Sequence, residues 1–154
     1  MVERSRTARV KLPSLDLSIV RQYCSISEDD TSNDSLIWQY YKAALDAAES
    51  FCGRFFTESN VVITDYDDTL RIPSKIDEIT SVKLNGEVTT DYILQSQYLS
   101  LPTVGNVEVE YTTVEDVPNP VWIFIYKFIL YNLERNNPER GELDHSDLIT
   151  YRER

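Results

Sequence analysis

The chain has 154 residues, of which 42% are hydrophobic and 27% charged, so it is long enough and apolar enough to fold around a core. Its formal net charge is −11. That charge argues against a nucleic-acid-binding protein, because such proteins attract phosphates with a surplus of Lys and Arg. We interpret the basic stretch Arg4–Lys11 and the acidic run Glu28–Asp30 as solvated segments.

The sequence contains two cysteines, Cys24 and Cys52, and no CxxC pair. Both lie in partly apolar stretches that look helical, so we expect two buried free thiols rather than a disulfide. Residues 2–13 lack the apolar segment of a signal peptide. These features together favour assembly in a reducing cytoplasm.

The N-terminal part predicts two helices. Residues 2–12 are polar and basic, and the sequence leaves open whether they form a strand or a flexible arm. Ser14 is a candidate cap for a short helix over Leu15–Tyr23. A long helix is expected over Asp34–Phe56, ending near Gly53, because apolar residues recur there at three- and four-residue steps. We interpret this stripe as core, and its members are Ile37, Tyr41, Ala44, Leu45, Ala48, Phe51, Cys52 and Phe55.

After residue 56 the apolar residues alternate with polar ones, which is the pattern of half-buried strands. Asn85-Gly86 is a typical two-residue hairpin turn. This block therefore predicts a small antiparallel sheet of hairpins. Its expected strands contain Val61–Ile63, Leu70–Ile72, Ile79–Leu84, Tyr92–Leu94, Tyr98–Leu101 and Val107–Tyr111.

A last helix is predicted over Val121–Glu134, with Asn119 as its cap and Pro120 as its first residue. This helix is apolar nearly all round, yet it is shorter than the ~20 residues that span a bilayer. A helix without a polar face needs cover on more than one side. We expect the domain core to cover one side and a neighbouring subunit the other, through a ring interface of Trp122, Phe124, Tyr126, Phe128 and Tyr131.

The predicted fold class is α+β: a small helical bundle of two N-terminal helices and one C-terminal helix, with an inserted antiparallel β-hairpin sheet and a polar C-terminal tail. Residues 1–138 are expected to form a single domain and residues 139–154 a tail or arm. The tail has few apolar residues to anchor it, which suits a segment that folds on a partner.

One motif is similar to a catalytic one. The stretch VVITDYDDTL resembles the first motif of haloacid-dehalogenase-type phosphatases, in which Asp65 would be the nucleophile, Asp67 the acid/base, and Mg²⁺ would lie between them. The later motifs of that family are missing, and hairpins follow where helix–strand units belong. We therefore expect Asp65, Asp67 and Asp68 to lie in or beside a hairpin turn and to bind no metal tightly, and we keep a Mg²⁺-dependent phosphatase as the alternative of another class.

The order of the elements resembles the head–tail connector (adaptor) proteins of long-tailed bacteriophages. The resemblance is carried by Ala43–Arg54, Leu70–Pro73, Ile79–Gly86 and Asp91–Leu94, and it covers residues 12–136. It implies a structural virion protein without catalysis or cofactor. Such a protein forms a ring of roughly a dozen copies at the neck, below the portal, and extends the channel through which DNA passes without specific binding. A stopper or tail-terminator ring subunit is the close alternative.

The resemblance further implies two protein partners, the portal and a stopper or tail-completion protein. The tail is expected to dock on the portal, with apolar side chains in small pockets and charged ones fixing the register. Its expected portal-binding residues are Leu143, Asp147, Leu148, Ile149, Tyr151 and Arg152. On this interpretation, deleting Gly141–Arg154 leaves the melting temperature unchanged.

Overall fold

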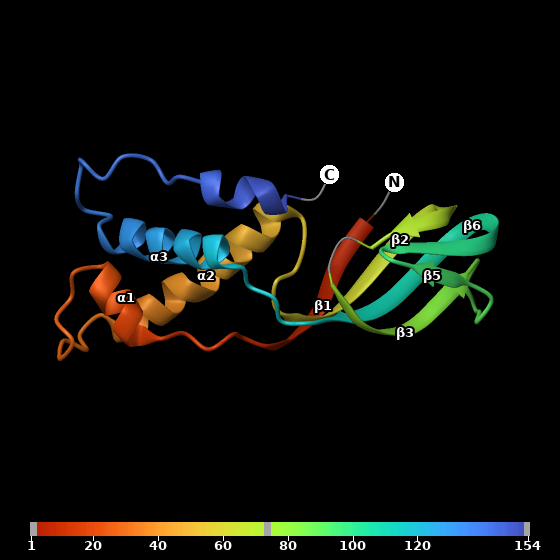
Figure 1. Cartoon of the computed structure of the whole chain (residues 1–154), viewed down its shortest axis with the longest axis horizontal. Coiled ribbons are helices and arrows are strands. Elements are labelled where there is room, and N and C mark those ends of the chain that lie inside the picture. The colour runs from red at the N-terminus through yellow and green to blue at the C-terminus, as the bar shows by residue number, and fades with distance from the viewer. Residues whose placement is uncertain (1–2, 73–74, 153–154) are drawn as a thin grey trace. The chain divides into compact units, whose positions relative to one another are not determined.

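The structure, a computed structural model, describes residues 3–72 and 75–152 (Figure 1). The chain forms two compact units, each built from two stretches of sequence. The sheet unit comprises residues 1–13 and 55–116, and the helical unit comprises residues 14–54 and 117–154. The strands are β1 (Glu3–Lys11), β2 (Glu58–Arg71), β3 (Ile76–Leu84), β4 (Glu87–Val88), β5 (Ile93–Gln95) and β6 (Tyr98–Thr113). The helices are α1 (Leu17–Tyr23), α2 (Asp34–Cys52), α3 (Asn119–Leu133) and the 3₁₀ helix η1 (Ser146–Tyr151).

The predicted combination of helices with an antiparallel sheet is confirmed. That residues 139–154 form a separate tail or arm stays a prediction. Within this chain, residues 139–152 pack in the helical unit. Over the residues that the structure describes, no helix has the length and apolar character needed to cross a membrane.

The N-terminal helices begin and end at residues whose local chemistry explains the boundary. Asp16, not Ser14, caps α1, because its Oδ1 accepts the N–H of Ser18 at 3.0 Å. Helix α2 ends at Cys52, as the predicted end near Gly53 requires, because Gly53 takes the left-handed conformation with φ of 67°. Asn119 is already part of α3, so it is not the predicted cap.

The core of the helical unit is the stripe predicted on α2, packed against α3. Tyr41 and Leu45 are fully buried, whereas Phe51 is half-buried and Phe55 lies beyond the helix end in the sheet unit. The α3 side of this core consists of Val121, Phe124, Ile125 and Ile129. Helix α1 is tied to the first turn of α2 by Arg21, whose Nη2 lies 2.8 and 2.7 Å from the carboxylate oxygens of Asp34.

The sheet unit is a six-stranded antiparallel sheet of order β1-β2-β6-β3-β4, with β5 paired to β6 (Figure 1). Residues 3–11 form the edge strand β1, which settles the question that the sequence left open. Strand β2 contains the predicted segment 61–63 and residues 70–71 of the next one, and β6 contains both 98–101 and 107–111. The alternation of apolar and polar residues breaks between the two segments of β2 because Tyr66–Thr69 are all exposed.

A wide bulge explains how the long pair β2–β6 forms one core. Asp67 pairs with Gly105 and Thr69 with Ser100, so Asp68 alone lies opposite residues 101–104 of β6. Leu70 and Ile63, from the two sides of this bulge, belong to the same buried cluster. The two parts of the β2–β6 pair therefore contribute to one core.

Smaller bulges in β3 produce an apolar spacing that is foreign to a regular strand. The pairing with β6 shifts between Ile76 and Glu78 and again between Ile79 and Ser81. Each shift inserts one residue, so Ile76, Ile79 and Val82, three residues apart, all face the core cluster. A regular strand would have turned the middle one toward solvent.

The predicted Asn85-Gly86 turn is confirmed. Leu84 pairs with Glu87, and the two turn residues have φ of 53° and 85°, as a type I′ turn requires. The Asn85 side chain also accepts the N–H of Asn106 at 2.9 Å, which ties the turn to β6.

Replacing Gly105 with alanine is expected to lower the free energy of unfolding by about 1–3 kcal/mol, because the new methyl group overpacks this junction. A Cβ at position 105 would lie 2.7 Å from Oδ1 of Asn85 and 2.9 Å from Cδ1 of Leu84. Urea unfolding measures the loss, with Thr103→Ala at an exposed position of β6 as the control. Equal stability of the two variants would contradict the clash.

Candidate functional site

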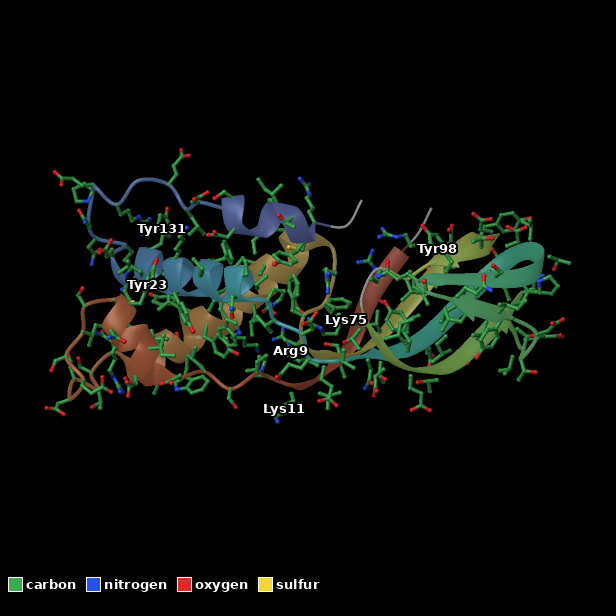
Figure 2. All side chains as sticks on the ribbon, in the orientation of Figure 1. Arg9, Lys11, Tyr23, Lys75, Tyr98 and Tyr131 are labelled. Atoms are coloured by element: carbon green, nitrogen blue, oxygen red, sulfur yellow. The ribbon has the colours of Figure 1, made fainter. Side chains whose placement is uncertain are left out.

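Five aromatic rings form a continuous row across the helical unit, here called the aromatic ladder. The row runs from Tyr23 to Tyr126, Trp122, Tyr41 and Trp38, with successive centroid separations of 5.8, 6.0, 6.0 and 5.8 Å. Tyr23, labelled in Figure 2, ends the row on α1, and the other rings come from α3 and α2. The ladder thus joins three helices that are separated in the sequence.

The ladder is accessible to solvent at its two ends and partly covered between them. Trp38 is 42% and Tyr23 40% exposed, Trp122 and Tyr126 are half-buried, and Tyr41 is fully buried. Exposed Ile19 precedes Tyr23 by one turn of α1, and exposed Ile123 follows Trp122 on α3. We call the ladder with these two isoleucines the aromatic surface. Clustered Trp, Tyr and Ile on a surface are typical of protein–protein contacts.

Of the residues predicted for a ring interface, Trp122 and Tyr126 lie in the aromatic surface. Phe124 does not: it is fully buried, with its ring 6.0 Å from Phe128 and 5.4 Å from His145, so it is a core residue. Phe128 is half-buried beside it. Tyr131 is covered by Arg140, whose guanidinium lies 3.9 Å from the ring centroid and whose Nη1 donates to the Tyr131 carbonyl at 3.0 Å.

The second cover of α3 comes largely from this chain itself. The 3₁₀ helix η1 packs against both α2 and α3, and its Leu148 is fully buried. The thiol of Cys52 donates to the Leu148 carbonyl oxygen at 3.6 Å. The sequence did not predict this intramolecular cover, because a segment with few apolar residues has no periodic pattern that marks a buried face. The expectation that a neighbouring subunit covers a further side of α3 stays a prediction.

Polar contacts hold the C-terminal segment in place as well. Lys127 Nζ lies 2.7 Å from Asp147 and 3.8 Å from Asp144, and the hydrogen bond to Asp147 raises the pKa of Lys127. The His145 ring lies 5.2 Å from that of Phe51, and the guanidinium of Arg152 lies 5.0 Å from the Phe51 centroid. Residues 139–152 thus pack as part of the helical unit.

The residues predicted to bind a portal differ in accessibility. Leu148 is buried and Asp147 is engaged with Lys127. Ile149 is 61% exposed, and Arg152 is also exposed. Leu143 and Tyr151 are half-buried.

The Asp motif lies within β2 at the wide bulge, not at the expected hairpin turn. Asp67 Oδ1 accepts the N–H of Asp68 at 2.7 Å and that of Thr69 at 3.4 Å, and these bonds lower the Asp67 pKa. Asp65 accepts the N–H of Tyr66 at 2.8 Å. Within residues 3–72 and 75–152, no three His, Cys, Asp or Glu side chains are placed to hold a metal ion. The geometry indicates that Asp67 completes the hydrogen bonding of the bulge.

Asp67→Asn is accordingly expected to leave the melting temperature nearly unchanged, because the amide oxygen of Asn accepts the same two N–H groups. Titration calorimetry with Mg²⁺ should detect no tight binding to either protein. Micromolar Mg²⁺ affinity that disappears in Asp67→Asn would instead restore the phosphatase hypothesis.

Both cysteines are free, as predicted. Cys52 is fully buried, whereas Cys24 is half-buried rather than buried. Burial, with a smaller effect of the nearby Glu134 carboxylate, raises the pKa of the Cys24 thiol to about 11. The thiol is therefore neutral at physiological pH and a poor nucleophile.

No protein-family model and no curated protein matches the sequence. Solved structures do match in fold. A chain of the neck of an empty gene transfer agent particle, computed with C6 symmetry, is 12% identical with a TM-score of 0.72, and the match covers 97% of this chain and 95% of that one.

A chain from the virion of the native gene transfer agent particle matches with a TM-score of 0.68 at 14% identity, covering 97% of this chain and 94% of that one. A chain from the neck of the native particle, computed with C12 symmetry, has a TM-score of 0.67 at 12% identity over the same shares. The fold similarity covers 97% of this chain, so it includes residues of both the sheet unit and the helical unit.

Proposed function

We propose that the chain is a subunit of a ring-forming head–tail connector of a phage-like particle, which joins the portal vertex to the tail and extends the DNA channel. The observation that carries this proposal is the fold match, which covers 97% of this chain and 95% of a neck chain. The order of sequence motifs supports the same family independently of that match. Necks computed with C6 and C12 symmetry fit a cyclic assembly of roughly a dozen copies.

The aromatic surface is the proposed ring contact. Trp122 and Tyr126 remain from the sequence-based interface, and Trp38 and Ile123 join them. In a ring each subunit presents two different faces, so this surface packs against another face of the next subunit. Phe128 lies beside the buried Phe124, and Tyr131 is covered by Arg140. We therefore assign both residues a secondary role in the ring contact, which requires the C-terminal segment to move first.

The C-terminal segment is the proposed portal contact. Ile149 and Arg152 are exposed for it, and Tyr151 is half-exposed beside them. Leu143 is also half-buried. Leu148 and Asp147, which contact the rest of the helical unit, take part in the portal contact once η1 detaches from α3. Because ion pairs contribute, binding should weaken as salt rises.

The remaining assignments follow from the connector role. A stopper or tail-completion protein binds the opposite end of the ring, and DNA passes through without specific contacts, consistent with a net charge of −11. The protein is assembled in the host cytoplasm, resides in the virion neck and performs no catalysis. A stopper or tail-terminator subunit would differ only in its position along the channel.

Electron microscopy of the protein mixed with the portal of its own particle tests the proposal. The expected image is a ring of this chain on the portal. Both tryptophans of the chain, Trp38 and Trp122, lie in the aromatic surface, so their fluorescence should shift to the blue on assembly.

Ile123→Asp is expected to prevent this ring, because it places a charge in the contact without disturbing a buried residue. Val88→Asp, at a 71% exposed position of the sheet unit, is the matched control and should assemble. A ring that forms equally well with Ile123→Asp would refute the aromatic surface as the contact. A portal that never recruits the chain would refute the connector role.

A further inference from the structure

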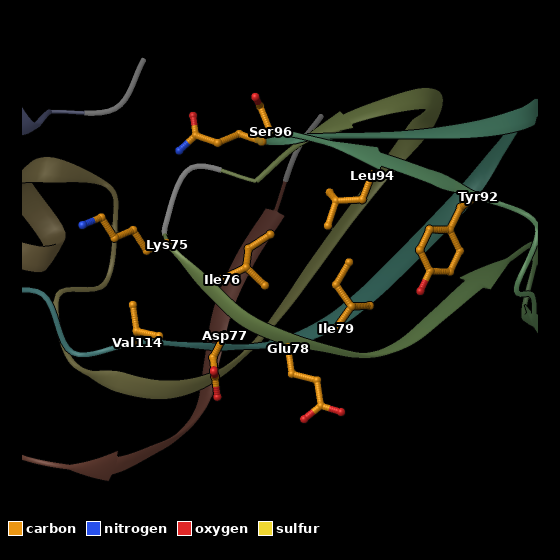
Figure 3. Close-up of a pocket in the computed structure, with 10 residues that line it drawn as sticks. Lys75, Ile76, Asp77, Glu78, Ile79, Tyr92, Leu94, Ser96 and Val114 are labelled. Carbon is orange, nitrogen blue, oxygen red and sulfur yellow. The ribbon is translucent and has the colours of Figure 1, made fainter.

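The sheet unit has an open groove between β3 and β5, here called the seam groove. Its volume is about 630 Å³, and its lining includes Ile76, Ile79, Tyr92 and Leu94. In Figure 3 the two isoleucines of β3 point toward Leu94 and Tyr92 on the opposite side. The groove is large enough to take several side chains of a ligand.

Both strands that border the groove have an open edge. Strand β3 pairs with β6 on one side, and on the other side β4 pairs only with Lys83 and Leu84. Strand β5 pairs with β6. Among the described residues, no strand pairs with the second edge of residues 76–81 or of residues 93–95. Such edges offer N–H and C=O groups to an added strand.

The floor of the groove continues the core of the sheet. Ile76, Ile79 and Tyr92 are half-buried and pack against the buried cluster, and Leu94 is 40% exposed. An added strand would place every second side chain on this apolar floor. Each apolar residue placed there would remove both its own surface and that of the floor from water.

The charges beside the groove define the other face of the ligand. Lys75 Nζ is held by Asp116 at 2.9 Å. Asp77 and Glu78 are exposed and project away from the apolar floor (Figure 3). The outward side chains of an added strand would lie on that acidic side, where Lys or Arg is favoured.

We propose that the seam groove binds an extended segment of a partner protein in which apolar residues alternate with Lys or Arg, and that this segment adds to the sheet as a further strand. Its apolar side chains cover Ile79 and Leu94, while its cations face Asp77 and Glu78. This binding concerns the single chain, so it holds or fails independently of ring formation.

Fluorescence anisotropy with labelled, end-blocked synthetic peptides tests the proposal on the full chain at low salt. The probe is Val-Lys-Val-Lys-Val-Lys-Val, and the comparison peptides replace either all lysines with glutamate or the central lysine with proline. Both comparison peptides are expected to bind at least about tenfold more weakly, because one reverses the charge and the other lacks a ladder N–H. Hydrogen exchange should show new amide protection in residues 76–81 and 93–95.

Leu94→Ser should weaken the binding of the lysine peptide by about tenfold, because it removes apolar surface from the floor of the groove. Position 94 is not part of the buried core. Val88→Ser, on the neighbouring hairpin and also exposed, is the matched control and should bind like the original chain. Equal binding by Leu94→Ser, equal binding of the proline peptide, or protection elsewhere in the chain would each overturn the proposal. The proposal would also be overturned if the chain without peptide associates with itself and Leu94→Ser abolishes this association. The occupant of the groove would then be a second copy of the chain.

Discussion

Phe124→Ala is expected to lower the free energy of unfolding of the helical unit by about 3–5 kcal/mol, the range for removing a buried aromatic ring. Phe124 is fully buried. Its ring lies near that of Phe128, also on α3, and near that of His145, which directly precedes η1. Truncation leaves a cavity that α3 and the segment before η1 cannot close without moving. Urea unfolding followed by far-ultraviolet circular dichroism measures the loss.

The neighbouring residue supplies the matched control. Ile123 is 42% exposed, so Ile123→Ala is expected to cost less than about 1 kcal/mol. Ile123→Ala should nevertheless impair ring assembly on the portal, although its stability stays close to that of the original chain. A Phe124→Ala variant with unchanged stability would return this residue to the interface that its sequence pattern favoured.

Removal of Gly141–Arg154 is expected to lower the melting temperature clearly, contrary to what the polar tail predicts from sequence alone. The deletion takes away η1, uncovers parts of α2 and α3, and breaks the contact of Lys127 with Asp147. Leu148→Ala by itself should cost about 2–5 kcal/mol, because the side chain is fully buried. Thermal unfolding of the deletion and of Leu148→Ala checks both statements.

Ile149→Ala is the control for this experiment. Ile149 is 61% exposed on η1, so its truncation should change stability by less than about 0.5 kcal/mol. Portal binding should nevertheless weaken, since Ile149 is among the exposed residues assigned to that contact. An unchanged melting temperature after the deletion would mean that the segment contributes nothing to the fold, and undiminished portal binding would move that contact to another surface.

Local patterns in the sequence determined helix α2 and the tight turn. The stripe of Ile37, Tyr41 and Ala48 needs only the three- and four-residue steps of one helix, so the sequence predicts both α2 and its buried face. The Asn85-Gly86 turn is local as well, because positive φ at both positions is a property of those two residues. Trp122 and Tyr126 were identified as interface candidates, but the ladder needs α1 and α2 beside them.

Contacts between distant residues decided the rest. The bulges that bring Ile76, Ile79 and Val82 to one face exist only in the pairing with β6, about thirty residues away in sequence. In the sequence alone, the Asp motif resembles a catalytic one. In the structure, β2 pairs with β6 there, and Asp67 accepts hydrogen bonds from N–H groups of the bulge. The cover of α3 by η1 depends on a few buried contacts, such as that of Leu148, which carry no periodicity. A pattern of period two or 3.6 reports which face of an element is apolar, and only the folded chain decides what covers that face.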